Sequence, residues 1–203
     1  MRGWTEHEGL ALALDREGVD TDQLIPARFM MTPRSQGYGR FLLNDLRYDP
    51  HGTPIPDFPL NRHPEASILV SRRNFGSGSS REAAVYALVD FGFRAVVAPS
   101  FGDIFASNAV NNGLLPARVE SVDEILHALG AGTLPAKADL DSQSVTVGGI
   151  TRSFQIDRAW REKLINGWDD IDLTMARRQQ IAAFRAARAE AAPWAFMNEQ
   201  GNT

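Results

Sequence analysis

Three short apolar segments alternate with two longer segments of helical periodicity in the middle of the chain, and this alternation limits the possible folds more than any other feature. The apolar segments are residues 67–71, 94–100 and 114–119, and the helical segments are residues 80–93 and 101–113. Short apolar runs bounded by turn-forming residues are typical of buried strands. Parallel strands need a crossover connection, usually a helix, and such crossovers are right-handed. The pattern therefore predicts an α/β fold with a parallel or mixed central sheet.

The segments before and after this alternation predict further strands of the sheet, followed by a helical region. Residues 9–14 (GLALAL) form another short apolar run, which predicts a further buried strand. Residues 137–156 alternate apolar and polar side chains, which predicts an antiparallel meander with a hairpin turn at Gly148–Gly149. From Asp157 the pattern is helical until Pro193. We therefore expect residues 1–203 to form a single domain with a C-terminal helical extension over about residues 157–192.

Composition excludes several classes of function. The net charge of −4 argues against a nucleic-acid partner, which needs a clustered basic surface. The chain has no cysteine, so it cannot form a disulfide, use a thiolate nucleophile or hold an iron–sulfur cluster by itself. Residues 9–14 are too short for a signal sequence or a membrane span, and the four histidines lack metal-ligand spacing. We expect a soluble, cytoplasmic protein with no metal of its own and no membrane partner.

The segment Asn74–Glu82 (NFGSGSSRE) lies between a predicted strand and a predicted helix, and it is the strongest candidate for a site. Its two glycines permit positive φ and a close approach of a ligand to the backbone. A helix N-terminus supplies free N–H groups and partial positive charge, which together bind anions. Arg81 adds a forked donor that suits a carboxylate or a phosphate. The same residues also match a capping box from Ser79 to Glu82, which is a structural device.

The two interpretations of Ser79 are compatible. A capping hydroxyl accepts hydrogen bonds from backbone N–H groups, and donors aimed at an oxygen favour its ionised form. Ser79 is therefore placed to act as a base. Three familiar motifs do not match this segment: the dinucleotide fingerprint needs glycine where Arg81 stands, and both the P-loop and the G-x-S-x-G elbow are absent.

A second candidate is the acidic turn Asp20–Gln23 (DTDQ). Paired acids in a turn usually serve to form the turn, but Asp22 could also orient a basic group or a hydroxyl. Arg34 lies in a loop rich in glycine, proline and serine over residues 32–40. There it could bind an anion or simply be solvated.

Five motifs occur in order along nearly the whole chain. They are Asp20–Asp22 with Leu24–Pro26, Phe41–Asp45 (FLLND), Asn74–Glu82, Ala98–Phe101 (APSF) and Asn112–Pro116 (NGLLP). On these motifs the chain resembles the small subunits of 3-isopropylmalate dehydratase, within the aconitase superfamily. Several motifs in a fixed order are far more specific than any one of them alone.

The resemblance implies the swivelling β/β/α domain that corresponds to the C-terminal domain of aconitase. It implies a partner, a large subunit that carries a 4Fe-4S cluster on its own cysteines, in a heterodimer or a larger assembly. The implied reaction is a hydro-lyase step of leucine biosynthesis, in which 2-isopropylmalate and 3-isopropylmalate are interconverted by dehydration and rehydration. The substrate would then be a small dicarboxylate.

By the same resemblance, Ser79 is the base that removes the carbon-bound proton, and Ser80 and Arg81 hold the substrate carboxylate and activate that base. Asp22 matches the acidic residue of the superfamily's T-D motif. Arg34 is the nearest match to a carboxylate-binding arginine in the following loop, where the family distinguishes a bulky alkyl group from a carboxylate arm.

Two residues depart from the family pattern Asn-Phe-Gly-Cys-Gly-Ser-Ser-Arg-Glu-His. Ser77 stands where the pattern has cysteine, and Ala83 stands where it has histidine. Serine is nearly isosteric with cysteine, but the loss of histidine removes a titrating donor beside the site. Two alternatives therefore stay open. One is a paralogous small subunit that acts on another alkylmalate, such as 2-methylmalate or 2,3-dimethylmalate, and the other is a non-catalytic binding or regulatory subunit.

Overall fold

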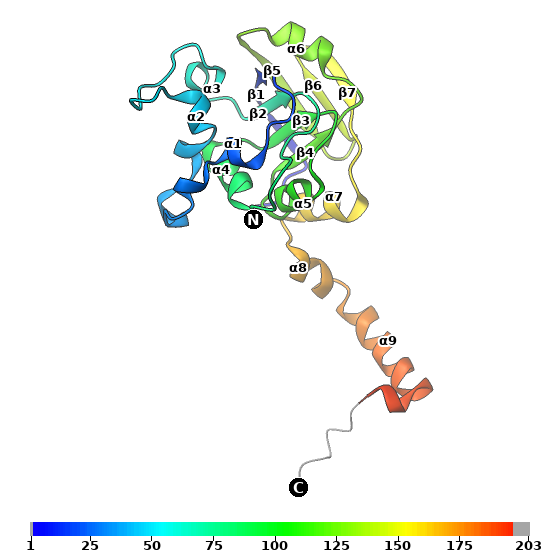
Figure 1. Ribbon diagram of the computed structural model, residues 1–203. Coiled ribbons are helices and arrows are strands. Elements are labelled where there is room, and N and C mark those ends of the chain that lie inside the picture. The colour runs from blue at the N-terminus through cyan, green and yellow to red at the C-terminus, as the bar shows by residue number, and fades with distance from the viewer. Residues whose placement is uncertain (1, 197–203) are drawn as a thin grey trace. The chain divides into compact units, whose positions relative to one another are not determined.

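One mixed sheet organises the first part of the computed structural model, which describes residues 2–196 (Figure 1). Its seven strands lie in the order β4-β3-β2-β1-β5-β6-β7. The strands are β1 (Glu6–Leu14), β2 (Ile68–Ser71), β3 (Ala95–Ala98), β4 (Leu115–Arg118), β5 (Thr133–Asp139), β6 (Ser144–Val147) and β7 (Ile150–Ser153). The chain divides after Trp168 into two compact units, and the whole sheet belongs to the first unit. The predicted α/β class is confirmed.

Strands β1 to β4 form the parallel half of the sheet. Residues 11–14 of β1 pair with residues 68–71 of β2, and β3 and β4 continue the sheet beyond β2. Helix α4 (Ala83–Phe91) connects β2 to β3, and helix α5 (Asp103–Asn111) connects β3 to β4. This arrangement brings the carboxyl ends of the parallel strands to one edge, which is where open α/β sheets bind ligands.

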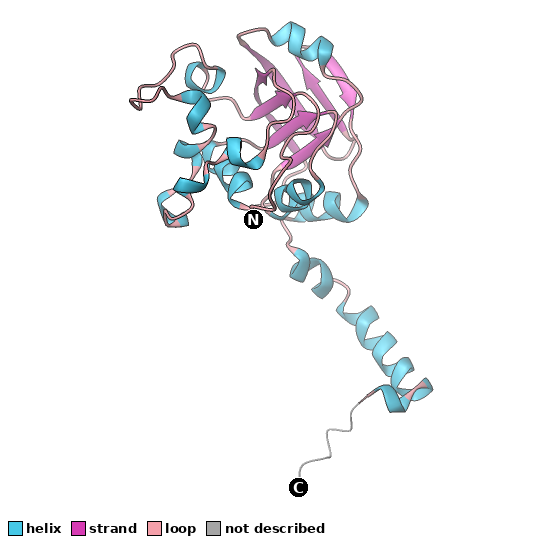
Figure 2. Cartoon of the chain, in the orientation of Figure 1, coloured by secondary structure: helices cyan, strands magenta, loops and turns pink. Residues whose placement is uncertain are grey.

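Alternating side chains of the strands fill two cores, one on each face of the sheet. In β1, Leu12 and Leu14 belong to the first core, and Ala11 and Ala13 belong to the second. Helix α4 contributes to the first core, whereas α6 (Asp123–Leu129) and α7 (Arg158–Asn166) contribute to the second. Figure 2 shows helices and loops around the sheet. Burial on both faces explains why β2 and β3 are short buried runs without a polar alternation.

The long segment between β1 and β2 contains only short helical elements. They are α1 (Thr21–Leu24), α2 (Asn44–Arg47), α3 (Pro59–Arg62) and the 3-10 turns η1 (Ala27–Phe29), η2 (Arg34–Gln36) and η3 (Gly39–Phe41). Arg47 is buried in this segment, where its guanidinium donates to the carbonyl of Leu42 at 3.2 Å and to the side chain of Asn61 at 2.9 Å. These bonds satisfy a buried cation and hold the segment against the first core.

The second half of the sheet is antiparallel. Strand β5 pairs with β1, and β5, β6 and β7 form the predicted meander. Gly148 and Gly149 have φ values of 56° and 89°, as a two-residue hairpin turn with the twist of the sheet requires. The predicted hairpin is therefore confirmed. Asp157 caps α7, because its carboxylate accepts a hydrogen bond from the N–H of Ala159 at 2.8 Å.

The second unit contains α8 (Asp170–Met175), α9 (Arg178–Ala191) and the 3-10 turn η4 (Pro193–Ala195). The helical pattern predicted from Asp157 is present, with interruptions before α8 and α9. Asp169 and Asp172 form a capping box at the start of α8. Within residues 2–196, every helix falls short of the length and apolar character that crossing a membrane requires.

Candidate functional site

The segment Asn74–Glu82, called the glycine loop from here on, leaves the carboxyl end of β2 and is tied to the segment that follows β1. The N–H of Gly76 donates to the carbonyl of Val19 at 2.7 Å. The N–H of Thr21 donates to the carbonyl of Ser77 at 2.9 Å. These bonds extend the pairing of β1 and β2 past the ends of the two strands, where Asp20 and Ser77 form an isolated parallel bridge.

The other side of the glycine loop is tied to the segment that follows β3. The N–H of Phe75 donates to the carbonyl of Ser100 at 3.1 Å, and the N–H of Gly102 donates to the carbonyl of Phe75 at 2.9 Å. Gly76 has a φ of 71°, and a Cβ atom there would lie 2.2 Å from the ring of Phe105. Only glycine fits this position, so the first half of the loop is fixed from both sides.

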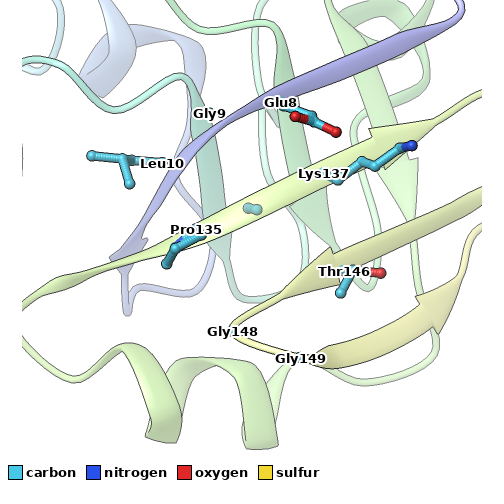
Figure 3. Close-up of a pocket in the computed structure, with 9 residues that line it drawn as sticks. Glu8, Gly9, Leu10, Pro135, Lys137, Thr146, Gly148 and Gly149 are labelled. Carbon is cyan, nitrogen blue, oxygen red and sulfur yellow. The ribbon is translucent and has the colours of Figure 1, made fainter.

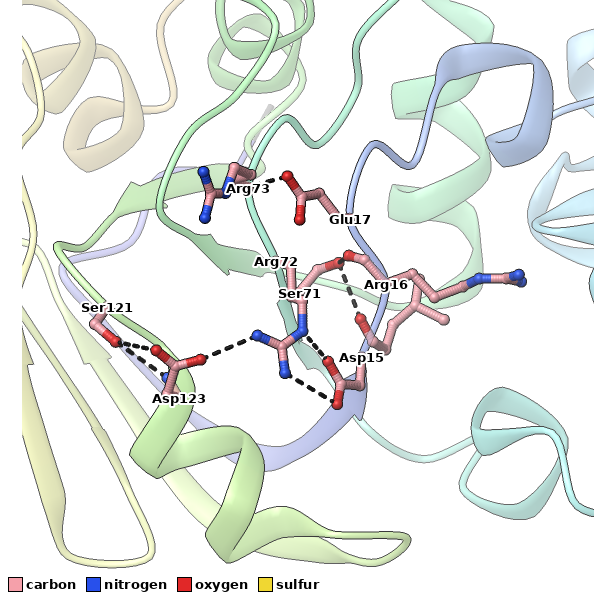
Figure 4. A network of polar contacts seen from close by, with 9 residues as sticks. Asp15, Arg16, Glu17, Ser71, Arg72, Arg73, Ser121 and Asp123 are labelled. Carbon is pink, nitrogen blue, oxygen red and sulfur yellow. Dashed lines mark hydrogen bonds and ion pairs between the residues drawn. The ribbon is translucent and has the colours of Figure 1, made fainter.

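An ion-pair network lies beside the base of the loop (Figure 4). The guanidinium of Arg72, next to the end of β2, pairs with Asp15 beyond β1 and donates to Asp123 at the start of α6 at 3.0 Å. Hydrogen bonds from the hydroxyl of Ser121 and then from the guanidinium of Arg72 hold the pKa of Asp123 below its ordinary value. The network connects the ends of two strands and the start of a helix beside the point from which the loop departs.

The predicted capping box does not form. Helix α4 begins at Ala83, and its N-cap residue Glu82 makes no capping hydrogen bond through its side chain. Ser79 therefore precedes the helix, and its carbonyl accepts a hydrogen bond from the hydroxyl of Thr21 at 3.1 Å. Backbone pairing of Gly76 and Ser77 with the segment after β1, and a φ of 97° at Gly78, keep this part of the chain out of the helix, so α4 starts later than its local sequence indicates. The hydroxyl of Ser79 is exposed and has no hydrogen-bond partner within residues 2–196.

The glycine loop also presents free backbone donors. No N–H group from Ser77 to Ala83 donates to an acceptor within residues 2–196. Gly78, Ser79 and Ser80 are exposed, so their N–H groups are open to solvent or to a ligand. Successive free N–H groups of this kind can bind a carboxylate or stabilise an oxygen anion. The donors that the sequence places in the first turn of a helix are supplied instead by the loop before that helix.

Arg81 and Asp22 lie together beside Ser79. The guanidinium of Arg81, with 26% of its side chain exposed, forms an ion pair with the carboxylate of Asp22. Asp20 has the structural role that paired acids usually have, because its carboxylate accepts a hydrogen bond from the N–H of Gln23 at 2.7 Å and caps α1. The structure therefore brings three of the predicted site residues into one place, since Ser79 and Arg81 share the loop and Asp22 contacts it.

The structure does not bring Arg34 to the same place. The guanidinium of Arg34 forms an ion pair with Asp90, in the last turn of α4, and lies over the ring of Tyr86 at 4.1 Å from the ring centre. The glycine loop meets the opposite end of that helix, which is about 13 Å long at 1.5 Å per residue. Arg34 is thus held by partners of its own rather than by the glycine loop.

Asn108 of α5 and Asn112 at the C-terminal end of α5 contact the glycine loop. The sequence analysis predicts neither of them as a site residue. The side-chain amide of Asn112 donates to the carboxylate of Glu82 at 2.8 Å. The side-chain amide of Asn108 donates to the carbonyl of Ser80 at 3.5 Å. Their spacing of four residues puts both on one helix face, and this is the signal by which the sequence could have indicated them.

A shallow groove of about 760 Å³ lies elsewhere, on the exposed face of β1, β5 and β6 (Figure 3). Leu10, Pro135, Lys137 and Thr146 line it together with neighbouring strand residues. It contains none of the candidate site residues. Ser79 and Ser80 lie instead on an exposed loop, so the described residues do not enclose a ligand beside them. A closed site there requires a second surface, because small-molecule sites normally bury most of their ligand.

The side chains of this chain do not fit an iron–sulfur cluster. Such clusters are held by cysteine thiolates, and the chain has no cysteine. Residues 2–196 also contain no group of three or more histidine, aspartate or glutamate side chains that could hold a metal ion.

Comparison with known proteins gives consistent matches. The family model of the aconitase C-terminal domain matches residues 1–121, and that of the C-terminal domain of 3-isopropylmalate dehydratase small subunits matches residues 170–198. The 3-isopropylmalate dehydratase small subunit of Teredinibacter turnerae is 41% identical, over 97% of this chain and 98% of its own length. That of Rhodopirellula baltica is 46% identical, over 93% of this chain and 100% of its own length. The crystal structure of a 3-isopropylmalate dehydratase from Methanocaldococcus jannaschii is 26% identical, with a TM-score of 0.65 over 89% of this chain and 99% of that chain.

The sheet, the glycine loop at the carboxyl ends of its parallel strands and the first family model define a domain of the aconitase C-terminal type. This confirms the predicted swivelling fold. The agreement with curated relatives extends over nearly the whole chain. The chain belongs to the family of 3-isopropylmalate dehydratase small subunits, as the sequence motifs predict.

Proposed function

We propose that this chain is the small subunit of a 3-isopropylmalate dehydratase, which interconverts 2-isopropylmalate and 3-isopropylmalate by dehydration and rehydration in leucine biosynthesis. The relatives of 41% and 46% identity carry this name. The observation that carries the proposal is the glycine loop. Its first half is fixed by backbone bonds on two sides, while its second half offers the unpartnered hydroxyl of Ser79 and N–H groups without an acceptor within residues 2–196.

Ser79 is the proposed base. A proton next to a carboxylate is weakly acidic, so its removal needs a strong base and stabilisation of the charge that develops on the substrate. An ionised serine hydroxyl can serve as that base where donors surround it. The free N–H groups of the glycine loop and the guanidinium of Arg81 are the donors that this chain offers beside Ser79.

Ser80 and Arg81 are the proposed ligands of a substrate carboxylate. Both belong to the exposed half of the loop, and arginine binds carboxylates through two parallel hydrogen bonds. Asp22 is proposed to fix the orientation of Arg81, which is supported by their ion pair. Arg34 is proposed to contact the substrate from the following loop, after leaving its partners on α4.

The proposed partner is a large subunit that holds a 4Fe-4S cluster on its own cysteines. Two observations support a partner: this chain has no thiolate to offer a cluster, and its candidate site is open on one side. The site residues would then be completed by the partner's surface in a heterodimer or a larger assembly. We propose a cytoplasmic location for this assembly. We propose that the chain forms one swivelling-type domain, with the C-terminal helices as its extension.

Ser77 and Ala83 depart from the family pattern, and these departures leave two alternative functions to be tested. Ala83 is buried at the start of α4, where the family pattern has histidine. A small subunit without that histidine could act on another alkylmalate, such as 2-methylmalate or 2,3-dimethylmalate. It could also have become a non-catalytic regulatory subunit, although Ser79, Ser80 and Arg81 are retained.

Reconstitution tests these functions directly. The chain is purified together with its cognate large subunit under anaerobic conditions, and formation of the alkene intermediate is followed by ultraviolet absorbance. Turnover of isopropylmalate by the complex, and by neither subunit alone, is the expected result. Faster turnover of 2-methylmalate or 2,3-dimethylmalate would assign the paralogous function. A stable complex that turns over none of these substrates would assign a non-catalytic one.

A further inference from the structure

The loop over residues 27–41, which contains η1, η2 and η3, packs closely on the last turn of α4. A Cβ atom on Gly39 would lie 2.6 Å from the backbone of Asp90, so the two backbones meet without space for a side chain. Tyr38 is buried, and the rings of Phe29 and Phe41 stack at 4.3 Å between their centres. The body of this loop is therefore firmly attached to the helix.

Asp90 is the polar centre of this contact. Its carboxylate accepts a hydrogen bond from the N–H of Tyr38 at 2.7 Å and forms an ion pair with the guanidinium of Arg34. The side chain of Asp90 is only 19% exposed, and that of Arg34 is 43% exposed. An acidic residue in the last turn of a helix opposes the helix dipole. The stability of α4 therefore does not account for Asp90, whereas its two partners in the loop do.

Tyr86 holds the other side of the same guanidinium. It lies one helical turn before Asp90, and the carbon at the centre of the Arg34 guanidinium stands 4.1 Å from the centre of its ring. Burial and a hydrogen bond with Glu82 raise the pKa of the Tyr86 hydroxyl, which keeps it neutral. Glu82 is the last residue of the glycine loop, so Tyr86 connects the place where Arg34 rests with the candidate site.

We propose that Asp90 and Tyr86 form an arginine latch, which holds Arg34 away from the substrate and must open before Arg34 can bind a substrate carboxylate. The proposal rests on the proposed function, because it assigns Arg34 a substrate to bind. Asp90 and Tyr86 hold the guanidinium on α4, so Arg34 must leave both before it can reach a carboxylate bound at the glycine loop. Asp90 is therefore a positioning residue that weakens substrate binding by stabilising the resting state. The apparent dissociation constant rises as the reciprocal of the fraction of molecules in which the latch is open.

A purely structural role for Asp90 makes the opposite prediction. If Asp90 only attaches the loop, its loss disorders a substrate-binding segment and raises KM. If it competes with the substrate, its loss releases Arg34 and lowers KM. The sign of the change in KM therefore separates the two roles.

The test compares Asp90→Asn with the wild-type chain in two measurements. Asparagine keeps an oxygen that can accept from the N–H of Tyr38 but removes the charge that holds Arg34. Hydrogen exchange of the purified chain, read by mass spectrometry on peptides over residues 27–41, is expected to accelerate about two- to fivefold, the range for a partly exposed ion pair. In the complex with the large subunit, KM is expected to fall by a similar factor. Tyr86→Leu, which removes the ring under Arg34, is expected to act in the same direction.

Arg40→Lys is the matched control. Arg40 lies in the same loop, donates to Gln36 at 3.1 Å and stacks on Phe41 rather than reaching Asp90. It is expected to leave both measurements unchanged. Equal exchange in Asp90→Asn and wild-type chains would overturn the latch, and so would faster exchange with a raised KM. If the complex turned over no alkylmalate, the proposed function would fail, and the exchange measurement would still decide whether Asp90 and Tyr86 hold Arg34.

Discussion

The guanidinium of Arg81 forms an ion pair with the carboxylate of Asp22, and this contact joins the loop after β2 to the helix after β1. These two segments are far apart in sequence, yet their carboxyl-end loops meet because β1 and β2 are adjacent and parallel. The ion pair fixes the orientation of the Arg81 guanidinium. Its other N–H groups can bind a second carboxylate. Its position beside Ser79 makes it the best placed cation for substrate binding in this part of the fold.

Replacing Arg81 with lysine is expected to weaken substrate binding more than it slows the chemical step. Lysine keeps the charge but loses the planar fork that binds a carboxylate through two hydrogen bonds. Hydrogen bonds to charged groups contribute about 1.5–3 kcal/mol, so KM should rise about 10- to 100-fold. Steady-state kinetics of the reconstituted complex measures this. Arg158→Lys, at an exposed ion pair with Glu162 on α7, is the control and should leave KM unchanged. An unaltered KM in Arg81→Lys would contradict the assignment.

Replacing Ser79 with alanine is expected to lower kcat by about 10²- to 10⁴-fold, which is the usual contribution of a general base. The hydroxyl has no hydrogen-bond partner within residues 2–196, so its removal should leave the free energy of unfolding nearly unchanged. Single-turnover rates and urea unfolding of the same preparations separate the two effects. Ser153→Ala, at an exposed serine on β7 outside the glycine loop, is the control, and full activity is expected there. Full activity in Ser79→Ala would remove Ser79 from the mechanism.

Replacing Gly76 with alanine is expected to destabilise the fold by about 2–5 kcal/mol. The left-handed backbone accounts for about 1–2 kcal/mol and the clash with Phe105 for about 1–3 kcal/mol. Gly149→Ala separates these contributions, since Gly149 has a φ of 89° but open space around its Cβ position. It should lose only the first contribution. Urea unfolding measures both variants, and equal losses would show that the contact with Phe105 is not tight.

Local patterns in the sequence predict the sheet well, because burial on both faces leaves each parallel strand as an apolar run of its own. Residues 68–71 and 95–98 are buried throughout, and the helices between the strands have the length that a parallel crossover needs. The hairpin at Gly148–Gly149 is equally local, since two adjacent positive φ values strongly favour glycine, asparagine or aspartate, and two glycines meet that need.

Such local patterns predict only part of the candidate site. Ser79 to Glu82 matches a capping box, but the bonds of Gly76 and Ser77 with the segment after β1 keep the chain non-helical, and α4 begins only at Ala83. The ion pair between Arg34 and Asp90 is likewise a long-range contact. The sequence around either residue does not predict it. In both cases the local sequence does not specify how the segment after β1 is placed relative to α4.

Stability is expected to fall as the pH is lowered from 7.5 to 5.5, and His7 is expected to be one cause. Burial and, to a smaller extent, the charge of Arg94 hold the pKa of His7 below its ordinary value of 6.5. Its Nε2 lies 2.8 Å from the hydroxyl of Ser67, on the neighbouring segment before β2. Between the lowered folded pKa and the unfolded value, the unfolded chain binds more protons than the folded one. Folding stability therefore rises with pH across this window and is lost as the pH falls through it.

The variant His7→Gln isolates this contribution, because glutamine can still bond to Ser67 but does not titrate. Urea unfolding of both chains at pH 7.5 and 5.5 gives a difference in unfolding free energy at each pH. The wild-type chain should lose stability relative to His7→Gln as the pH falls, since only the wild-type chain must place a charged imidazole in a half-buried site close to Arg94. A difference that stays constant between the two pH values would mean that His7 titrates alike in the folded and unfolded chains. Asp123 and Asp169 do not replace His7 in this range, because their lowered pKa values place their losses of stability below about pH 4.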